Sequence, residues 1–174
     1  MWEHEPIDVA ALLCEIYGRI PPLARHAAEG LDPEQLCAAP GPGINPIGWL
    51  IWHSARVQDH HVGELLDRPQ LWVEGSWAGR FGLDPDPDDI GYGHTADDVA
   101  RVRPQDTEAL FGYLDAVDAR TTTMLQGLRP EDLDKVVDRR WDPPVTLGVR
   151  LVSVADDGLQ HVGQAAYLRG LLGF

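Results

Sequence analysis

The chain has 174 residues, of which 44% are apolar, and its 28 acidic and 14 basic side chains give a formal net charge of −14. This length and apolar content predict one folded domain over residues 1–174 and argue against a disordered chain. The negative charge argues against nucleic acid as a partner, because an acidic surface repels a phosphate backbone.

No apolar run approaches the roughly 20 residues that cross a bilayer, so no membrane association is expected. The N-terminal residues, Met1 to Glu5, are acidic and lack the basic and apolar segments of a signal peptide. The two cysteines, Cys14 and Cys37, are too few for a disulfide framework. These features predict a cytoplasmic protein.

Four long segments have the apolar spacing of helices. The first runs from about Ile7 to Glu29, and Pro21-Pro22 should kink or split it, because proline lacks a backbone donor and crowds the preceding turn. The second is expected to begin at Asn45-Pro46, a favoured N-cap followed by proline at the first helical position. It continues to about Leu66.

The segment from Gln70 to Arg103 is a long connection between the second and third helices. It holds aromatic residues among many glycines, prolines and aspartates, which favours a functional loop packed over the bundle. A short helix is expected from Thr95 to Val102. The acidic run from Asp84 to Asp89 lacks the glycine and glutamate of an EF-hand, so it is interpreted as a surface loop.

The third long helix is expected from about Pro104 to Gln126. The fourth starts after Thr146, a good N-cap, and runs to Leu172. The short run from Lys135 to Asp138 is the nearest candidate for a strand, but no alternating pattern competes with the helices. The predicted fold class is therefore all-α, a four-helix bundle.

A weak internal repeat relates the two halves of the chain. Gly30 to Leu36 precedes the second long helix, Gly127 to Leu133 precedes the fourth, and both segments begin with Gly-Leu and contain Pro-Glu. Two helix pairs related by a pseudo-twofold axis would bring the second and fourth helices face to face.

The fourth helix carries Asp157 and His161 four residues apart, so both side chains project from one helix face. His53, on the second helix, is well placed to supply a third ligand. Two imidazoles and a carboxylate suit zinc, nickel, iron or manganese, and three protein ligands leave a position for water or substrate. The alternative is a hydrogen-bonded core histidine beside two tryptophans, with an aspartate that caps or pairs locally.

Other polar residues are candidates for contacts with a ligand or substrate. Gln164 lies one turn beyond His161 on the same face, where it would orient a ligand, bind substrate or simply face solvent. Three arginines are candidates for binding a carboxylate or a sugar-linked group, and the sequence does not rank them; they are Arg56, Arg80 and Arg169.

His60 lies two turns after His53 on the same helix face, about 10 Å further along the axis. That separation is too large for the two imidazoles to share one ion. His60 is therefore expected to line the pocket or support a ligand, and His61 to lie at the surface or in packing.

Two stretches of the chain resemble the DinB/YfiT-like superfamily. The run from Asn45 to His53, followed by Arg56 to His61, resembles the second helix of that family. The run from Trp141 to Val154, followed by Asp157 to Gly170, resembles its last helix in the branch linked to mycothiol. The resemblance covers nearly the whole chain. It implies an up-down-down-up bundle, often a homodimer, with a divalent metal, usually zinc or nickel, bound by three side chains.

Many members of the family use three histidines, and here Asp157 stands in place of one, so the resemblance implies His53, Asp157 and His161 as the metal ligands. The mycothiol-dependent isomerase of this superfamily is similar in having a carboxylate, a glutamate, at that place. The implied activity is that of a metal-dependent thiol S-transferase or isomerase, in which a mycothiol-type thiolate attacks a small electrophile. The alternatives are a metal-dependent hydrolase, a non-catalytic metal- or ligand-binding stress-response bundle, and a structural dimer.

Overall fold

The computed structural model describes residues 8–174. The start of the expected first helix at Ile7 and the acidic segment from Met1 to Glu5 lie outside the described residues. The long helices are α1 (Val9–Tyr17), α2 (Ile20–Ala28), α4 (Ile47–Leu66), α7 (Thr107–Leu125) and α8 (Leu147–Leu172). The shorter elements are α3 (Pro33–Leu36), α5 (Leu71–Glu74), α6 (Ala96–Arg101), the 3-10 turns η1 (Ala78–Phe81) and η2 (Pro130–Asp132), and the strands β1 (Val136–Asp138) and β2 (Val145–Thr146).

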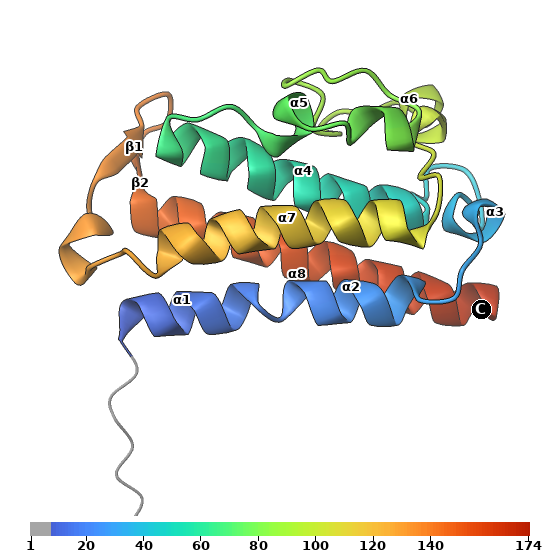
Figure 1. Ribbon diagram of the computed structural model, residues 1–174, viewed down its shortest axis with the longest axis horizontal. Helices are drawn as coiled ribbons and strands as arrows, with labels where there is room; N and C mark the ends of the chain where they lie inside the picture. The colour runs from blue at the N-terminus through green and yellow to red at the C-terminus, as the bar shows by residue number, and fades with distance from the viewer. Residues whose placement is uncertain (1–7) are drawn as a thin grey trace, which may run out of the picture.

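The long helices form a bundle in which α1 and α2 follow one another along a single rod (Figure 1). α4 and α7 run in the opposite direction to that rod, and α8 returns parallel to it (Figure 1). This is the up-down-down-up order, so the prediction of an all-α four-helix bundle is confirmed. Within residues 8–174 no helix combines the length and the apolar character that a membrane span requires.

The first predicted helix is divided, as the two prolines indicated. Gly18 caps the end of α1, and Pro21 and Pro22 lie in the first turn of α2. The backbone N–H groups of a first turn have no partner within the helix, so proline removes no hydrogen bond there. The break therefore falls just before the prolines rather than at them.

The predicted start of α8 is confirmed, whereas the starts of α4 and α7 differ from the prediction. α8 begins after Thr146, whose side chain accepts a hydrogen bond from a backbone N–H of the first turn, as predicted. The prediction of Asn45 as the N-cap of α4 is wrong, because Pro46 occupies the cap in an extended conformation without a side-chain hydrogen bond. α7 begins after Asp106 rather than at Pro104, since the Asp106 carboxylate caps it.

The connection from α7 to α8 contains a small antiparallel sheet. β1 pairs with β2, with Val136 opposite Thr146 and Asp138 opposite Val145. The strand candidate near Lys135 is therefore confirmed, whereas β2 is too short to give an alternating pattern. The hairpin places residues 139–144 at the end of the bundle where α4 ends and α8 begins (Figure 1).

The second and fourth long predicted helices, α4 and α8, pack face to face, as the internal repeat suggested. α4 is buried on most sides, because α7 and the segment 70–103 cover the rest of its surface (Figure 1). That segment is pinned by Asp59, whose carboxylate accepts hydrogen bonds from the backbone N–H groups of Leu71 and Trp72 and from the Tyr113 hydroxyl. The predicted packed loop is thus confirmed, and its short helix α6 lies where it was expected.

Candidate metal centre

The three predicted ligands come together between α4 and α8. His53 projects from α4 toward Asp157 and His161 on α8, and one possible ligand atom of each lies within 4.8 Å of the other two. The imidazole rings of His53 and His161 are arranged edge to face, with 4.7 Å between their centroids. The side chains of Asp157 and His161 remain 29% and 18% exposed, so one side of the cluster is open to solvent.

The orientation of His53 is set by the loop that crosses α4. Its Nδ1 lies 2.5 Å from the carbonyl oxygen of Ile90, so Nδ1 carries the proton and donates it to that carbonyl. Nε2 is then the nitrogen left with a free lone pair. Metal-binding histidines characteristically donate their other ring N–H to a carbonyl or carboxylate in this way.

Glycine is required beside this hydrogen bond. Gly91 has a φ of +91°, and a Cβ placed on it would lie 2.7 Å from the Nδ1 of His53. It would also lie 3.0 Å from Trp49 and Trp52. The loop backbone therefore lies directly against the His53 ring, and a side chain at this position would displace it.

His161 is oriented by its own helix. Its Nδ1–H donates to the main-chain carbonyl oxygen of Asp157, one turn earlier, at 2.7 Å. As with His53, this leaves Nε2 free to bind a ligand. Both imidazoles are thus held by backbone carbonyls in the tautomer that presents Nε2.

The carboxylate of Asp157 is the least satisfied group in the cluster. Its Oδ2 is buried and has no hydrogen-bond partner among the described residues. The nearest ring nitrogen, His161 Nδ1, lies 3.4 Å away and donates its proton to the main-chain carbonyl of Asp157 instead. A buried carboxylate oxygen without a partner is costly. A cation held between Asp157, His53 and His161 would remove that cost, so the donor set fits a divalent metal ion.

The surroundings shift the pKa values of His53 and His161 in opposite directions. Burial lowers the pKa of His53 below its ordinary value, which favours the neutral imidazole that metal binding requires. Burial alone would also lower the pKa of His161, but the nearby Asp157 carboxylate and the hydrogen bond to the Asp157 main-chain carbonyl outweigh it, and the pKa is raised. A proton therefore competes with a metal ion mainly at His161.

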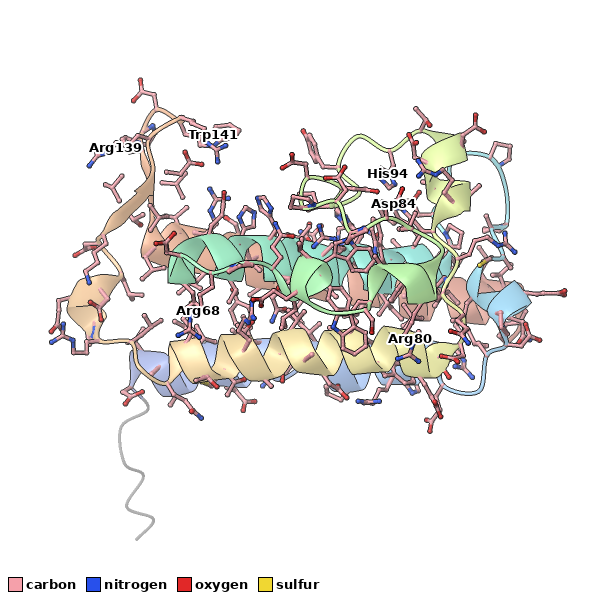
Figure 2. The ribbon with its side chains drawn as sticks, turned by 45° about the horizontal axis from the view of Figure 1, so that its top comes forward. Arg68, Arg80, Asp84, His94, Arg139 and Trp141 are labelled. Carbon is pink, nitrogen blue, oxygen red and sulfur yellow. The ribbon has the colours of Figure 1, made fainter. Side chains whose placement is uncertain are left out.

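A hydrogen-bonded chain from the loop supports the His53 ring. Trp49 stacks on His53, with 4.7 Å between centroids and 12° between planes. The Trp49 Nε1–H donates to His94 Nδ1 at 3.1 Å, and His94 Nε2–H donates to Asp89 at 2.7 Å. His94 lies on the loop over α4 (Figure 2). Neither His94 nor Asp89 is predicted from the sequence, because no spacing along the chain links them to the second helix.

Arg56 holds the same loop from beneath. It is fully buried, and its guanidinium donates to the carbonyl oxygens of Asp86, Pro87 and Asp89 and to the Gln70 side chain. The structure thus places Arg56 beneath the loop, where its fully buried side chain supports the loop backbone. The other two arginine candidates lie away from the triad, since Arg80 pairs with Asp106, and Arg169 donates to carbonyls that end α2.

His60 and His61 form a second group with Glu64, at the C-terminal end of α4. Each imidazole already has a protein partner. His60 Nδ1 accepts from Gln70 at 3.1 Å, while His61 contacts Glu64 at 3.2 Å and accepts from Arg150 at 3.3 Å. The structure keeps His60 apart from the triad, as its distance along the helix indicated.

Gln164 lines a cavity of about 530 Å³ beside the triad. The cavity lies one helical turn from the ligands on both helices, because Leu50 precedes His53 by three residues and Gln164 follows His161 by three. Its walls are largely apolar; the other lining residues are Gly43, Ile44, Asn45, Gly163, Tyr167, Leu168 and Leu171. A small molecule with an apolar body would fit there, one helical turn from the triad.

The model of the DinB superfamily matches residues 18–165, which include all three residues of the triad. The chain belongs to the DinB superfamily. A crystal structure of a conserved protein from Enterococcus faecalis is similar to this DinB-superfamily chain, with 32% identity over 97% of this chain and 100% of that one, and a TM-score of 0.88. No curated protein matches the chain. The superfamily inferred from the sequence is confirmed, whereas the mycothiol-linked branch stays a prediction.

Proposed function

We propose that this DinB-superfamily protein is a metal-dependent S-transferase or isomerase that uses a mycothiol-type thiol and acts on a small electrophilic molecule. The observation that carries the proposal is the triad of His53, Asp157 and His161, in which one possible ligand atom of each residue lies within 4.8 Å of the other two and the buried Asp157 Oδ2 has no hydrogen-bond partner among the described residues. Zinc and nickel suit this donor set. A bound divalent ion would lower the pKa of a thiol that it coordinates, so that thiolate is available near neutral pH.

The residues around the triad cover one side of it and leave the other side open. Trp49 and the loop at Gly91 cover one side of the His53 ring and exclude water from it. The exposed edges of Asp157 and His161 leave the opposite side open to substrates. The apolar cavity beside Gln164 would hold one of the two substrates, with the amide free to hydrogen bond to a polar group on it.

The first test is elemental analysis of untagged protein purified without chelator. We expect close to one equivalent of zinc or nickel in the wild type and none in His161→Ala. His26→Ala is the matched control, because His26 is an exposed histidine on α2. Absence of metal from the wild type, even after zinc or nickel is added, would leave a non-catalytic bundle as the better account.

The second test is thiol transfer by the metal-loaded protein. A bimane electrophile that fluoresces on alkylating a thiol would be offered with mycothiol, cysteine or glutathione as the thiol. We expect acceleration that is strongest with mycothiol and is lost in His161→Ala. Equal rates with and without protein for every thiol would reject the transferase assignment while leaving the metal site intact.

A further inference from the structure

A second cavity lies at the β1–β2 hairpin, beside the start of α8. This cavity has a volume of about 450 Å³ and is lined by Ile90, Tyr92, Asp138, Arg140, Trp141 and Arg150. Ile90 connects the two places, because its carbonyl oxygen is the one that accepts the hydrogen bond from His53. Figure 2 shows Trp141 and Arg139 on the segment that projects beside this end of α4.

Arg150 lies on the same face of α8 as the triad. It precedes Asp157 by seven residues, which is close to two full turns and about 10 Å along the helix axis. Its side chain is only 15% exposed and is fixed at both ends of the guanidinium, by Asp138 at 2.9 Å and by His61 at 3.3 Å. Only some of its five N–H groups are used, so others remain for a ligand.

The cavity carries more positive than negative charge. Arg140 and Arg150 share one carboxylate, that of Asp138, at 2.8 Å and 2.9 Å. Hydrogen bonds from Arg140 hold the pKa of that carboxyl well below its usual range, so Asp138 stays ionised and neutralises only one of the two guanidiniums. Arg139 adds a further cation and Glu64 an anion at the adjoining cavity beside His61.

This local excess of cations is unusual in a chain whose net charge is −14. The ion pair between Arg150 and Asp138 links α8 to β1, and Arg150 is the less exposed of the two arginines. The Arg140 side chain is 75% exposed, so a ligand can approach the N–H groups of its guanidinium that Asp138 does not use. Guanidinium groups bind carboxylate and phosphate groups through paired N–H donors.

We propose that the cavity lined by Arg140 and Arg150 binds the anionic group, a carboxylate or a phosphate, of the electrophilic substrate, whose reactive end reaches the triad. This inference rests on the proposed function for the identity of the ligand as the substrate. The axial separation between Arg150 and Asp157 suits a short organic acid together with the reach of an arginine side chain. Trp141 and Tyr92, both exposed at the cavity, would cover the body of such a molecule.

The test is calorimetric titration of the metal-loaded protein with succinate and, separately, with inorganic phosphate. We expect one of the two to bind, and the one that binds identifies the anionic group as carboxylate or phosphate. Affinity should fall about tenfold or more in Arg140→Met and Arg150→Met, because each removes hydrogen bonds to a charged ligand. Arg101→Met is the matched control, since Arg101 is an exposed arginine on α6, and it should leave the affinity unchanged.

Two further samples separate this inference from the proposed function. In His161→Ala, which should lack metal, the anion should still bind at the arginines; in Arg140→Met the metal content should stay at the wild-type level. If Arg150→Met does not fold, the anion affinities of Arg140→Met and of the conservative variant Arg140→Lys test the inference, because Arg140 is exposed. Binding of neither anion, or binding that is unchanged by both arginine variants, would overturn the inference and leave the metal proposal standing.

Discussion

The Nδ1 of His53 lies 2.5 Å from the carbonyl oxygen of Ile90, a residue 37 positions further along the chain. The long connection after α4 therefore folds back over the helix and fixes the tautomer of a candidate metal ligand. Arg56 donates hydrogen bonds to the loop backbone from below. Trp49 connects His94 of the loop to His53, because it donates to His94 and stacks on the His53 ring. The properties of the triad should consequently depend on loop residues that contact no ligand.

Replacing Gly91 tests this dependence directly. Gly91→Ala should weaken metal binding and lower the free energy of unfolding by about 1–3 kcal/mol, because a Cβ at a φ of +91° meets His53 Nδ1 at 2.7 Å. Gly93→Ala is the control, since Gly93 also has a positive φ, +76°, but has open space around it. Chelator competition and urea denaturation measure the two effects. Equal metal affinities in the two variants would contradict the role given to the loop.

Asp157→Asn should change metal affinity and apoprotein stability in opposite directions. Metal affinity should fall by at least tenfold, because the variant replaces an anionic ligand by a neutral amide. The chelator-treated protein should be as stable as the wild type or more so, because the buried Oδ2 of Asp157 has no hydrogen-bond partner among residues 8–174. Thermal unfolding with and without chelator separates the two effects.

Asp156→Asn is the neighbouring control for that comparison. The Asp156 side chain is exposed and accepts a hydrogen bond from Gln160 at 2.7 Å. This variant should leave metal affinity unchanged and alter stability by less than about 1 kcal/mol. A marked loss of apoprotein stability in Asp157→Asn alone would indicate a local structural role for that carboxylate instead of a ligand role.

The two histidines should give the metal-free protein opposite pH dependences. The folded-state pKa of His161 is raised, so its contribution to stability is present below the unfolded pKa of about 6.5 and is lost as the pH rises through the folded value. The folded-state pKa of His53 is lowered, so stability falls as the pH drops below about 6.5 toward the folded value. The wild type would be compared with His161→Gln and His53→Gln between pH 5 and 9. Parallel differences for the two variants would refute these assignments.

His94→Leu should act on the triad through Trp49. The Trp49 Nε1–H loses its acceptor, which should lower the free energy of unfolding by about 1–2 kcal/mol. Metal affinity should fall about tenfold, as for other residues that orient a ligand, and by less than in His161→Ala. His26→Leu, on the exposed face of α2, should change neither quantity. A loss of metal binding in His94→Leu as complete as that in His161→Ala would instead place His94 among the ligands.

The sequence by itself determined the helices and the pair of ligands on α8. Apolar spacing located the long helices, and the cap at Thr146 set the start of α8, because these signals are local to a few turns of chain. The spacing of Asp157 and His161 required both side chains to share one helix face. Asn45 failed as a cap because the adjacent proline already held the chain extended before α4.

Only the tertiary structure decided how those ligands are supported and what surrounds them. The carbonyl of Ile90, the glycine at position 91 and the chain through His94 reach His53 across a loop, so no spacing along the sequence reports them. The surroundings of the arginines also depend on tertiary contacts. Arg56, near His53 in sequence, is buried beneath the loop, whereas Arg150 meets Arg140 only because the β1–β2 hairpin folds over the start of α8. Periodicity fixes which face of an element a side chain occupies, but its partners are set by the contacts that long-range packing creates.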